Sequence, residues 1–158
     1  MTQMPKHRGF NTVGFVDDLE PLEALAVRYL RMWCEAPDHQ RQVWEDFSKA
    51  LGASSGRTAL KSLEALLDLC LRHARRPLMR HSVGCACLCA DEACFATLLG
   101  YASEGQREDA FLMATALVRP DIAIALSALA EEVGFALRRI ALKAREDVHD
   151  RPRGLTLH

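Results

Sequence analysis

A chain of 158 residues fits a single domain, or one domain with tails. Apolar residues make up 49% of it and charged residues 26%, and no apolar run approaches the roughly 18 residues that a membrane span needs. The formal net charge of -1 gives the whole chain no attraction to nucleic acid or to anionic lipid. Residues 1–15 lack the apolar stretch of a secretory signal, so we expect a cytoplasmic protein.

Apolar residues recur at helical spacing along most of the chain, which predicts an all-α fold. The predicted helices cover residues 18–36, 37–51, 56–74, 91–103, 107–118 and 121–146. Pro21 in a first turn and Gly52 after a last turn are ordinary signals for helix ends. No strand is convincing, although residues 82–88 could be extended. We therefore expect one compact bundle of five to six helices over residues 18–148, between an irregular N-terminal arm (1–17) and a frayed C-terminal tail (149–158).

The last two predicted helices are expected to supply much of the core. The helix over residues 107–118 is apolar around most of its circumference, which is typical of a central, buried helix. The helix over residues 121–146 carries a regular apolar stripe: Ile122, Leu126, Leu129, Val133, Leu137 and Ile140. This stripe could instead face a second copy of the chain, so a homodimer through the sixth helix is an alternative.

Four of the six cysteines lie within residues 85–94, in an irregular connector between the third and fourth predicted helices. In a reducing compartment, such a group indicates metal binding, catalysis or packing rather than disulfides. Zinc prefers thiolate and imidazole ligands. The predicted metal ligands are His81, Cys85 and Cys87, with a fourth from Cys89, Cys94 or His73.

A fully extended connector could not bind one ion through alternate cysteines. Cys85 and Cys87 would point to the same face about 6.6 Å apart, whereas sulfurs around one zinc ion lie roughly 3.8 Å apart. A zinc site therefore requires the backbone to curl, which Gly84 permits. Two alternatives stay open: the cysteines are packed as small apolar side chains, or Cys94 is a thiol with a lowered pKa in the first turn of a helix capped by Asp91.

Four arginines lie close together in sequence just before the cysteines: Arg72, Arg75, Arg76 and Arg80. Guanidinium groups bind phosphate and carboxylate bidentately, so this basic flank is a candidate anion-binding surface. The anion could also be the phosphate backbone of a nucleic acid. Arginines also occur at helix ends simply because they complement the helix dipole.

No catalytic residue is assigned, because the motifs of serine hydrolases, phosphate-binding loops and zinc proteases are all absent. The sequence predicts a small binding or regulatory module whose Cys/His cluster holds a structural metal ion, zinc first, and which could bind a protein partner. The alternatives are a nucleic-acid or anion-binding protein that uses the basic flank, and a thiol-redox protein in which His81 serves Cys94 or Cys85 as base.

Overall fold

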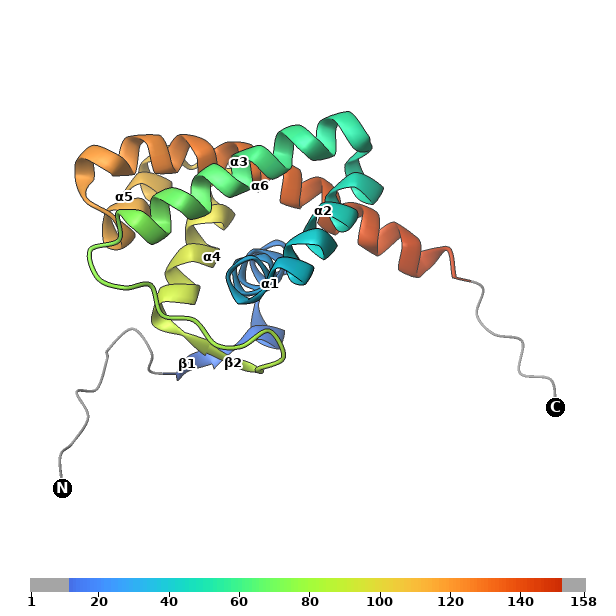
Figure 1. Cartoon of the computed structure of the whole chain (residues 1–158), viewed down its shortest axis with the longest axis horizontal. Helices are drawn as coiled ribbons and strands as arrows, with labels where there is room; N and C mark the ends of the chain where they lie inside the picture. The colour runs from blue at the N-terminus through green and yellow to red at the C-terminus, as the bar shows by residue number, and fades with distance from the viewer. Residues whose placement is uncertain (1–11, 152–158) are drawn as a thin grey trace, which may run out of the picture.

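The computed structural model describes residues 12–151, and within them it confirms the predicted all-α bundle (Figure 1). The helices are α1 (Pro21–Glu35), α2 (Pro37–Leu51), α3 (Ala53–Arg72), α4 (Ala90–Ser103), α5 (Arg107–Leu117) and α6 (Pro120–His149). Proline opens α1, α2 and α6, where its missing N–H has no helical partner to lose. Within residues 12–151, no helix combines the length and the hydropathy that a transmembrane span requires. Residues 1–11 of the expected arm and 152–158 of the expected tail lie outside the described residues.

A small antiparallel sheet corrects the expectation that the chain has no strand. Strand β1 (Thr12–Phe15) pairs with β2 (Cys87–Cys89), so that Phe15 lies opposite Cys87 and Thr12 opposite Cys89. A 3-10 turn, η2 (Val16–Asp18), then leads from β1 into α1. The pairing joins segments far apart in sequence, and neither strand is long enough to show an alternating pattern of its own. The connector is thereby attached to the start of the described chain (Figure 1).

The central helix is α4, not α5. It packs against α1, α5 and α6, and its side chains Phe95, Leu98 and Leu99 are fully buried. Helix α5 buries mainly alanines and leaves Leu112 62% exposed, so the prediction of a central, buried fifth helix was wrong. Alanine is compatible with both a close helix contact and a solvated face, which explains why the composition of α5 was ambiguous. The predicted stripe on α6 is largely buried, as Leu126, Val133, Leu137 and Ile140 show.

Helices α4 and α6 approach each other closely at Gly134. A Cβ atom on this residue would lie 3.0 Å from the backbone nitrogen of Ser103 and 3.1 Å from the carbonyl oxygen of Leu99. Backbone atoms of a packed helix cannot move aside as the end of a long side chain can. The short distance between the two helices therefore depends on the missing side chain.

We predict that Gly134→Ala lowers the free energy of unfolding by about 1 kcal/mol or more, because overpacking displaces α4. This loss has to exceed the gain of about 1 kcal/mol that alanine brings inside a helix. Gly84→Ala is the control, since a Cβ there meets nothing within 4 Å. Urea denaturation measures both variants. If Gly134→Ala is as stable as the wild type or more so, the close approach has no energetic weight.

Candidate functional site

A buried ion pair holds the connector of residues 73–86 against the bundle. Arg31 in the second half of α1 and Glu92 in the first turn of α4 have side chains that are 2% and 0% exposed. The Nε of Arg31 donates to Oε1 of Glu92 at 2.7 Å, and Nη2 donates to Oε2 at 3.0 Å. This is the bidentate geometry that a guanidinium and a carboxylate prefer. Because both charges are removed from water, their remaining hydrogen-bonding capacity also has to be satisfied.

The rest of the guanidinium satisfies backbone carbonyls at the end of the connector and the start of β2. Arg31 Nη1 donates to the carbonyl oxygen of Cys85, and Nη2 donates to that of Cys87, both at 2.6 Å. Just before these carbonyls the chain turns at Gly84, where the Cys85 N–H donates to the Ser82 carbonyl at 3.0 Å. The connector therefore curls at Gly84, and the centre of the curl is a guanidinium group.

Glu92 satisfies backbone N–H groups in the same way. Its carboxylate accepts the N–H of His81 at 2.9 Å and the N–H of Cys89 at 3.1 Å. Cys89 is the N-cap of α4 and Glu92 is the third helical residue, so the two form a reciprocal capping box. The expectation that Asp91 caps this helix was wrong. Burial alone would raise the pKa of Glu92, but the bonds from Arg31 and from the Cys89 and His81 N–H groups outweigh it and lower this pKa.

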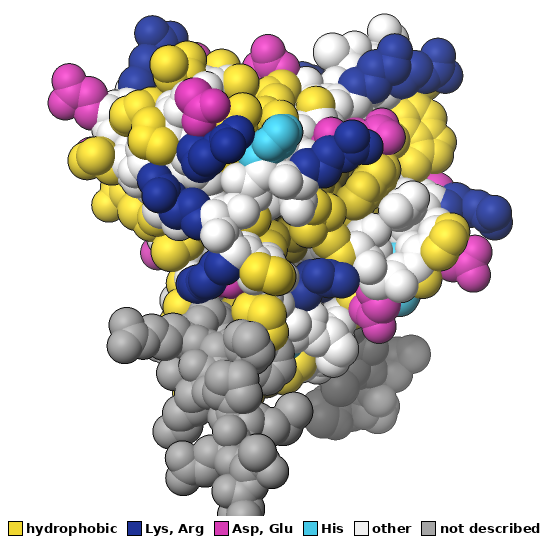
Figure 2. Space-filling model, turned by 60° about the vertical axis from the view of Figure 1, so that its left-hand side comes forward, with side chains coloured by type: hydrophobic (Ala, Val, Ile, Leu, Met, Phe, Trp, Pro, Cys, Tyr) yellow, Lys and Arg dark blue, Asp and Glu magenta, His cyan; other side chains and the backbone are white. Residues whose placement is uncertain are grey.

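Three arginines of the basic flank hold the connector at separate points, and the fourth, Arg72, pairs within α3. Arg76 pairs with Asp91 at 2.5 Å, and Arg75 donates to the Thr115 carbonyl at 2.7 Å. Arg80 donates to the carbonyl of Cys34 at 3.4 Å, and Arg72 pairs with Asp68 inside α3. Figure 2 shows basic side chains spread over this end of the molecule, among apolar and acidic ones. The four arginines do not converge on one point, and their use as an anion or nucleic-acid surface stays a prediction.

Part of the predicted ligand set does come together. Donor atoms of His81, Cys89 and Glu92 lie within 4.8 Å of one another and form a group that could hold a metal ion. His81 and Cys89 were predicted ligands, whereas Glu92 was not. Among the described residues this group does not include the other predicted ligands: His73, Cys85, Cys87 and Cys94. The sulfur of Cys89 lies 3.2 Å from the carbonyl oxygen of Met79 and donates to it.

The six cysteines are free thiols, and several are held in the protonated form. Burial raises the pKa of Cys89 to about 11 and that of Cys70 to about 12. The alternative that Cys94 has a lowered pKa is contradicted, because burial and then the charge of Asp91 raise this pKa. Helix α4 begins at Ala90, so Cys94 lies a full turn inside it, beyond the exposed N–H groups of the first turn.

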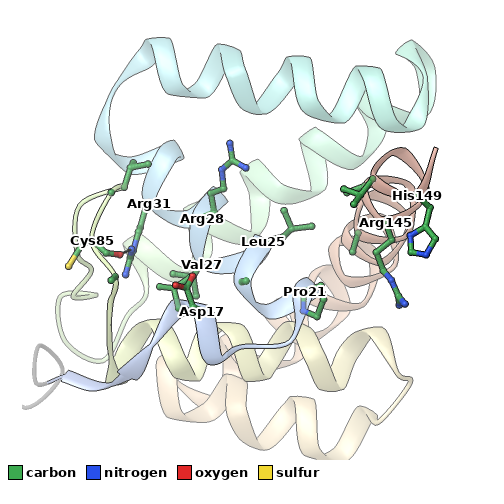
Figure 3. A pocket seen from close by; sticks show the side chains of 17 residues that line it. Asp17, Pro21, Leu25, Val27, Arg28, Arg31, Cys85, Arg145 and His149 are labelled. Carbon is green, nitrogen blue, oxygen red and sulfur yellow. Dashed lines mark hydrogen bonds between the residues drawn. The ribbon is translucent and has the colours of Figure 1, made fainter. Parts of the chain in front are cut away.

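An open groove of about 760 Å³ lies next to the ion pair, with α1 as its floor (Figure 3). The connector and the 3-10 turn η2 form one side of it, and the last turns of α6 form the other (Figure 3). Its lining is mainly apolar, with Arg28, Arg31, Arg145 and His149 as basic side chains and Asp17 as the acidic one. Further lining residues are Val16, Pro21, Ala24, Leu25, Val27, Val83, Gly84, Cys85, Ala86, Ala141, Ala144 and Val148. Arg31 and Cys85 belong both to the groove and to the network around the ion pair.

Sequence reasoning missed Arg31 and treated Glu92 only as a helix-capping residue. A signal was present for each. Arg31 follows the buried Val27 by four residues, one helical turn, so it places a charge on the buried face of α1. Cys89 and Glu92 have the three-residue spacing of a capping box, although cysteine is an unusual N-cap. Nothing in the local pattern joins two residues that are 61 positions apart.

We predict that Arg31→Met lowers the free energy of unfolding by about 3–5 kcal/mol, because it leaves the Glu92 carboxylate buried without its counter-charge. Arg72→Met is the control: it breaks an exposed ion pair with Asp68, which contributes little because water screens it. Denaturation in guanidinium chloride compares the two variants. Similar small losses for both would contradict the role given to the buried pair.

The lowered pKa of Glu92 also predicts how stability depends on pH. A carboxyl whose pKa is lower in the folded state adds stability above its unfolded value of about 4.3, and loses this contribution as the pH falls through the folded value. The difference in unfolding free energy between the wild type and Glu92→Gln should therefore be constant near neutral pH and shrink in acid. Urea titrations between about pH 3 and pH 7 measure it. A difference that does not change over this range would contradict the prediction.

Comparisons of the chain with protein-family models, with curated proteins and with solved structures found no match. We therefore infer its function from the groove and from the network that holds one of its walls.

Proposed function

We propose that the protein is a small ligand-binding module whose groove takes an amphipathic organic anion, such as a medium-chain carboxylate. The single observation that carries this proposal is the composition of the groove: an apolar lining with an excess of basic side chains. Its volume of about 760 Å³ lies in the range of about 300–1,000 Å³ that is typical of small-molecule sites. An apolar chain and one negative group match this lining better than a neutral or basic ligand.

The charges on the groove favour an anion. The positive charge of Arg31 is balanced by Glu92, so it adds little attraction. Arg28 on α1 and Arg145 on α6 are exposed, and neither takes part in an ion pair within residues 12–151. Asp17 offsets one of these charges. A carboxylate head would therefore meet a net positive rim, while its apolar tail lies along Leu25 and Val83.

We predict that decanoate binds to the groove and that replacing both Arg28 and Arg145 with Gln weakens binding about tenfold, since a factor of ten matches the loss of roughly one charged hydrogen bond. Isothermal titration calorimetry measures the affinity. Decanol should bind more weakly than decanoate, because it keeps the tail and lacks the charge. Arg119→Gln, at the far end of α6 and outside the groove, should leave binding unchanged.

Two results would overturn the proposal. One is the absence of any heat of binding for decanoate with folded wild-type protein. The other is equal binding of decanoate and decanol together with no effect of the double Arg replacement. A cavity-filling variant, Ala141→Phe, keeps the charges and reduces the space, so it separates loss of volume from loss of charge.

A metal ion at His81, Cys89 and Glu92 is the second candidate, favoured by the closeness of their donor atoms. Imidazole, thiolate and carboxylate all suit zinc. Three costs place this candidate second. The Glu92 carboxylate already accepts four N–H bonds, its positive partner Arg31 lies where it would repel a cation, and the pKa of Cys89 at about 11 disfavours the thiolate.

If this second candidate is right, elemental analysis of protein purified without added metal will find about one equivalent of zinc, and Cys89→Ser will lose it. Cys94→Ser is the matched control, because Cys94 is outside the group. Metal-free protein that unfolds at the same denaturant concentration with and without added zinc would exclude a structural metal.

A further inference from the structure

We propose that two copies of this chain associate through the outer face of α6, packed antiparallel about a twofold axis near Phe135. The buried stripe of α6 already faces its own core. The opposite face of the same helix carries a second row of side chains: Ile124, Ala128, Phe135 and Leu142. We call this row the outer stripe.

The outer stripe is apolar and exposed. Ile124, Phe135 and Leu142 are 68%, 47% and 52% exposed, although each is a large hydrophobic side chain. Ala128, Phe135 and Leu142 are spaced by seven residues, which keeps them in line along one side of a helix. A hollow of about 390 Å³ lies beside this line, between Ile124 and Phe135 on α6 and Arg107 on α5. A regular apolar row next to a hollow is suited to receive side chains from another helix.

Charged side chains on both borders of the outer stripe indicate which helix could pack against it. Glu132 and Arg139 lie seven residues apart on one border, toward α3, where Glu132 accepts a hydrogen bond from Ser62 at 2.7 Å. Glu131 and Arg138 lie seven residues apart on the other border, where Arg107 pairs with Glu131 at 3.0 Å. Acidic groups thus precede Phe135 on both borders, and basic groups follow it.

This arrangement is complementary to itself only when the second helix runs in the opposite direction. Phe135 lies midway in sequence between Ala128 and Leu142. It also lies within half a residue of the midpoint of each acidic–basic pair, Glu132 with Arg139 and Glu131 with Arg138. A twofold axis through this point places Glu132 beside Arg139 of the second copy, and Glu131 beside its Arg138. It also sets the small Ala128 against the large Leu142. A parallel pair would instead place like charges together, so the charge pattern selects one geometry.

The monomer contacts of these groups leave them able to pair. In the ion pair of Arg107 and Glu131 the two side chains are 80% and 25% exposed, and Ser62 and Glu132 are bonded at the surface. Arg138 donates to the Ser103 carbonyl through Nη1 alone, at 3.0 Å. Arg139 has no ion pair within the described part of the chain. The groove is lined by other α6 positions, Ala141, Ala144, Arg145, Val148 and His149, so this association and ligand binding are independent.

Sedimentation velocity over a concentration series tests the proposal. The wild type is expected to change from monomer to dimer as its concentration rises, and Phe135→Glu to stay monomeric. Phe15→Glu is the matched control, because Phe15 is 52% exposed but lies in β1, away from α6. The Phe15→Glu variant should therefore still form the dimer. Circular dichroism of each variant shows that it is folded.

A charge exchange tests the antiparallel geometry itself. Glu132→Arg and Arg139→Glu should each raise the dimer dissociation constant about tenfold. The two changes in one chain should restore the wild-type value, because each new charge meets the other on the second copy. Wild type that stays monomeric at every concentration, or a dimer that Phe135→Glu leaves intact, overturns the proposal. A dimer in which the double exchange gives no restoration overturns the antiparallel register.

Discussion

The pairing of Arg31 with Glu92 is the interaction on which the arrangement of the connector depends. Both side chains are almost fully removed from water, and a charge in that position is tolerated only when its hydrogen bonds are complete. Four of the bonds around the pair do not join the two charges to each other. They engage the carbonyls of Cys85 and Cys87 and the N–H groups of His81 and Cys89. The end of the connector and the short strand β2 are thus given hydrogen bonds that a longer helix or sheet would otherwise supply.

Several local features follow from this one interaction. The bonds to Cys85 and Cys87 set the path of the chain into β2, which then pairs with β1. The bond to Cys89 is half of the capping box that starts α4, the central helix of the bundle. The same guanidinium lies at the edge of the groove, whose wall includes Val83 to Ala86. An apolar pair of similar size could stabilise the fold as well, but it could not hold carbonyl and N–H groups in place.

The helices could be predicted from the sequence because their causes are local. Pro21, Gly52 and the apolar stripe of α6 act within a few residues of themselves. The ion pair, the β1–β2 pairing and the groove each join segments that are remote in sequence. Local patterns in a single sequence do not show which remote segments will contact each other. The central position of α4 was missed for a related reason. Its apolar residues surround the helix without a single stripe, and its two acidic residues, Asp91 and Glu92, suggest a solvated start although both are buried.

The position of the ion pair changes the role that we assign to the cysteines. A metal ion was expected because four cysteines and His81 cluster in and just before residues 85–94, and ligated thiols would also hold this irregular segment among the helices. Arg31 and Glu92 already perform this task with backbone hydrogen bonds, and Cys70 and Cys89 are buried thiols whose raised pKa values suit small apolar side chains. Since Glu92 is also part of the candidate metal group, an ion there would have to replace Arg31 rather than add to it. The two ways of holding the connector compete for one carboxylate, and the geometry favours the guanidinium.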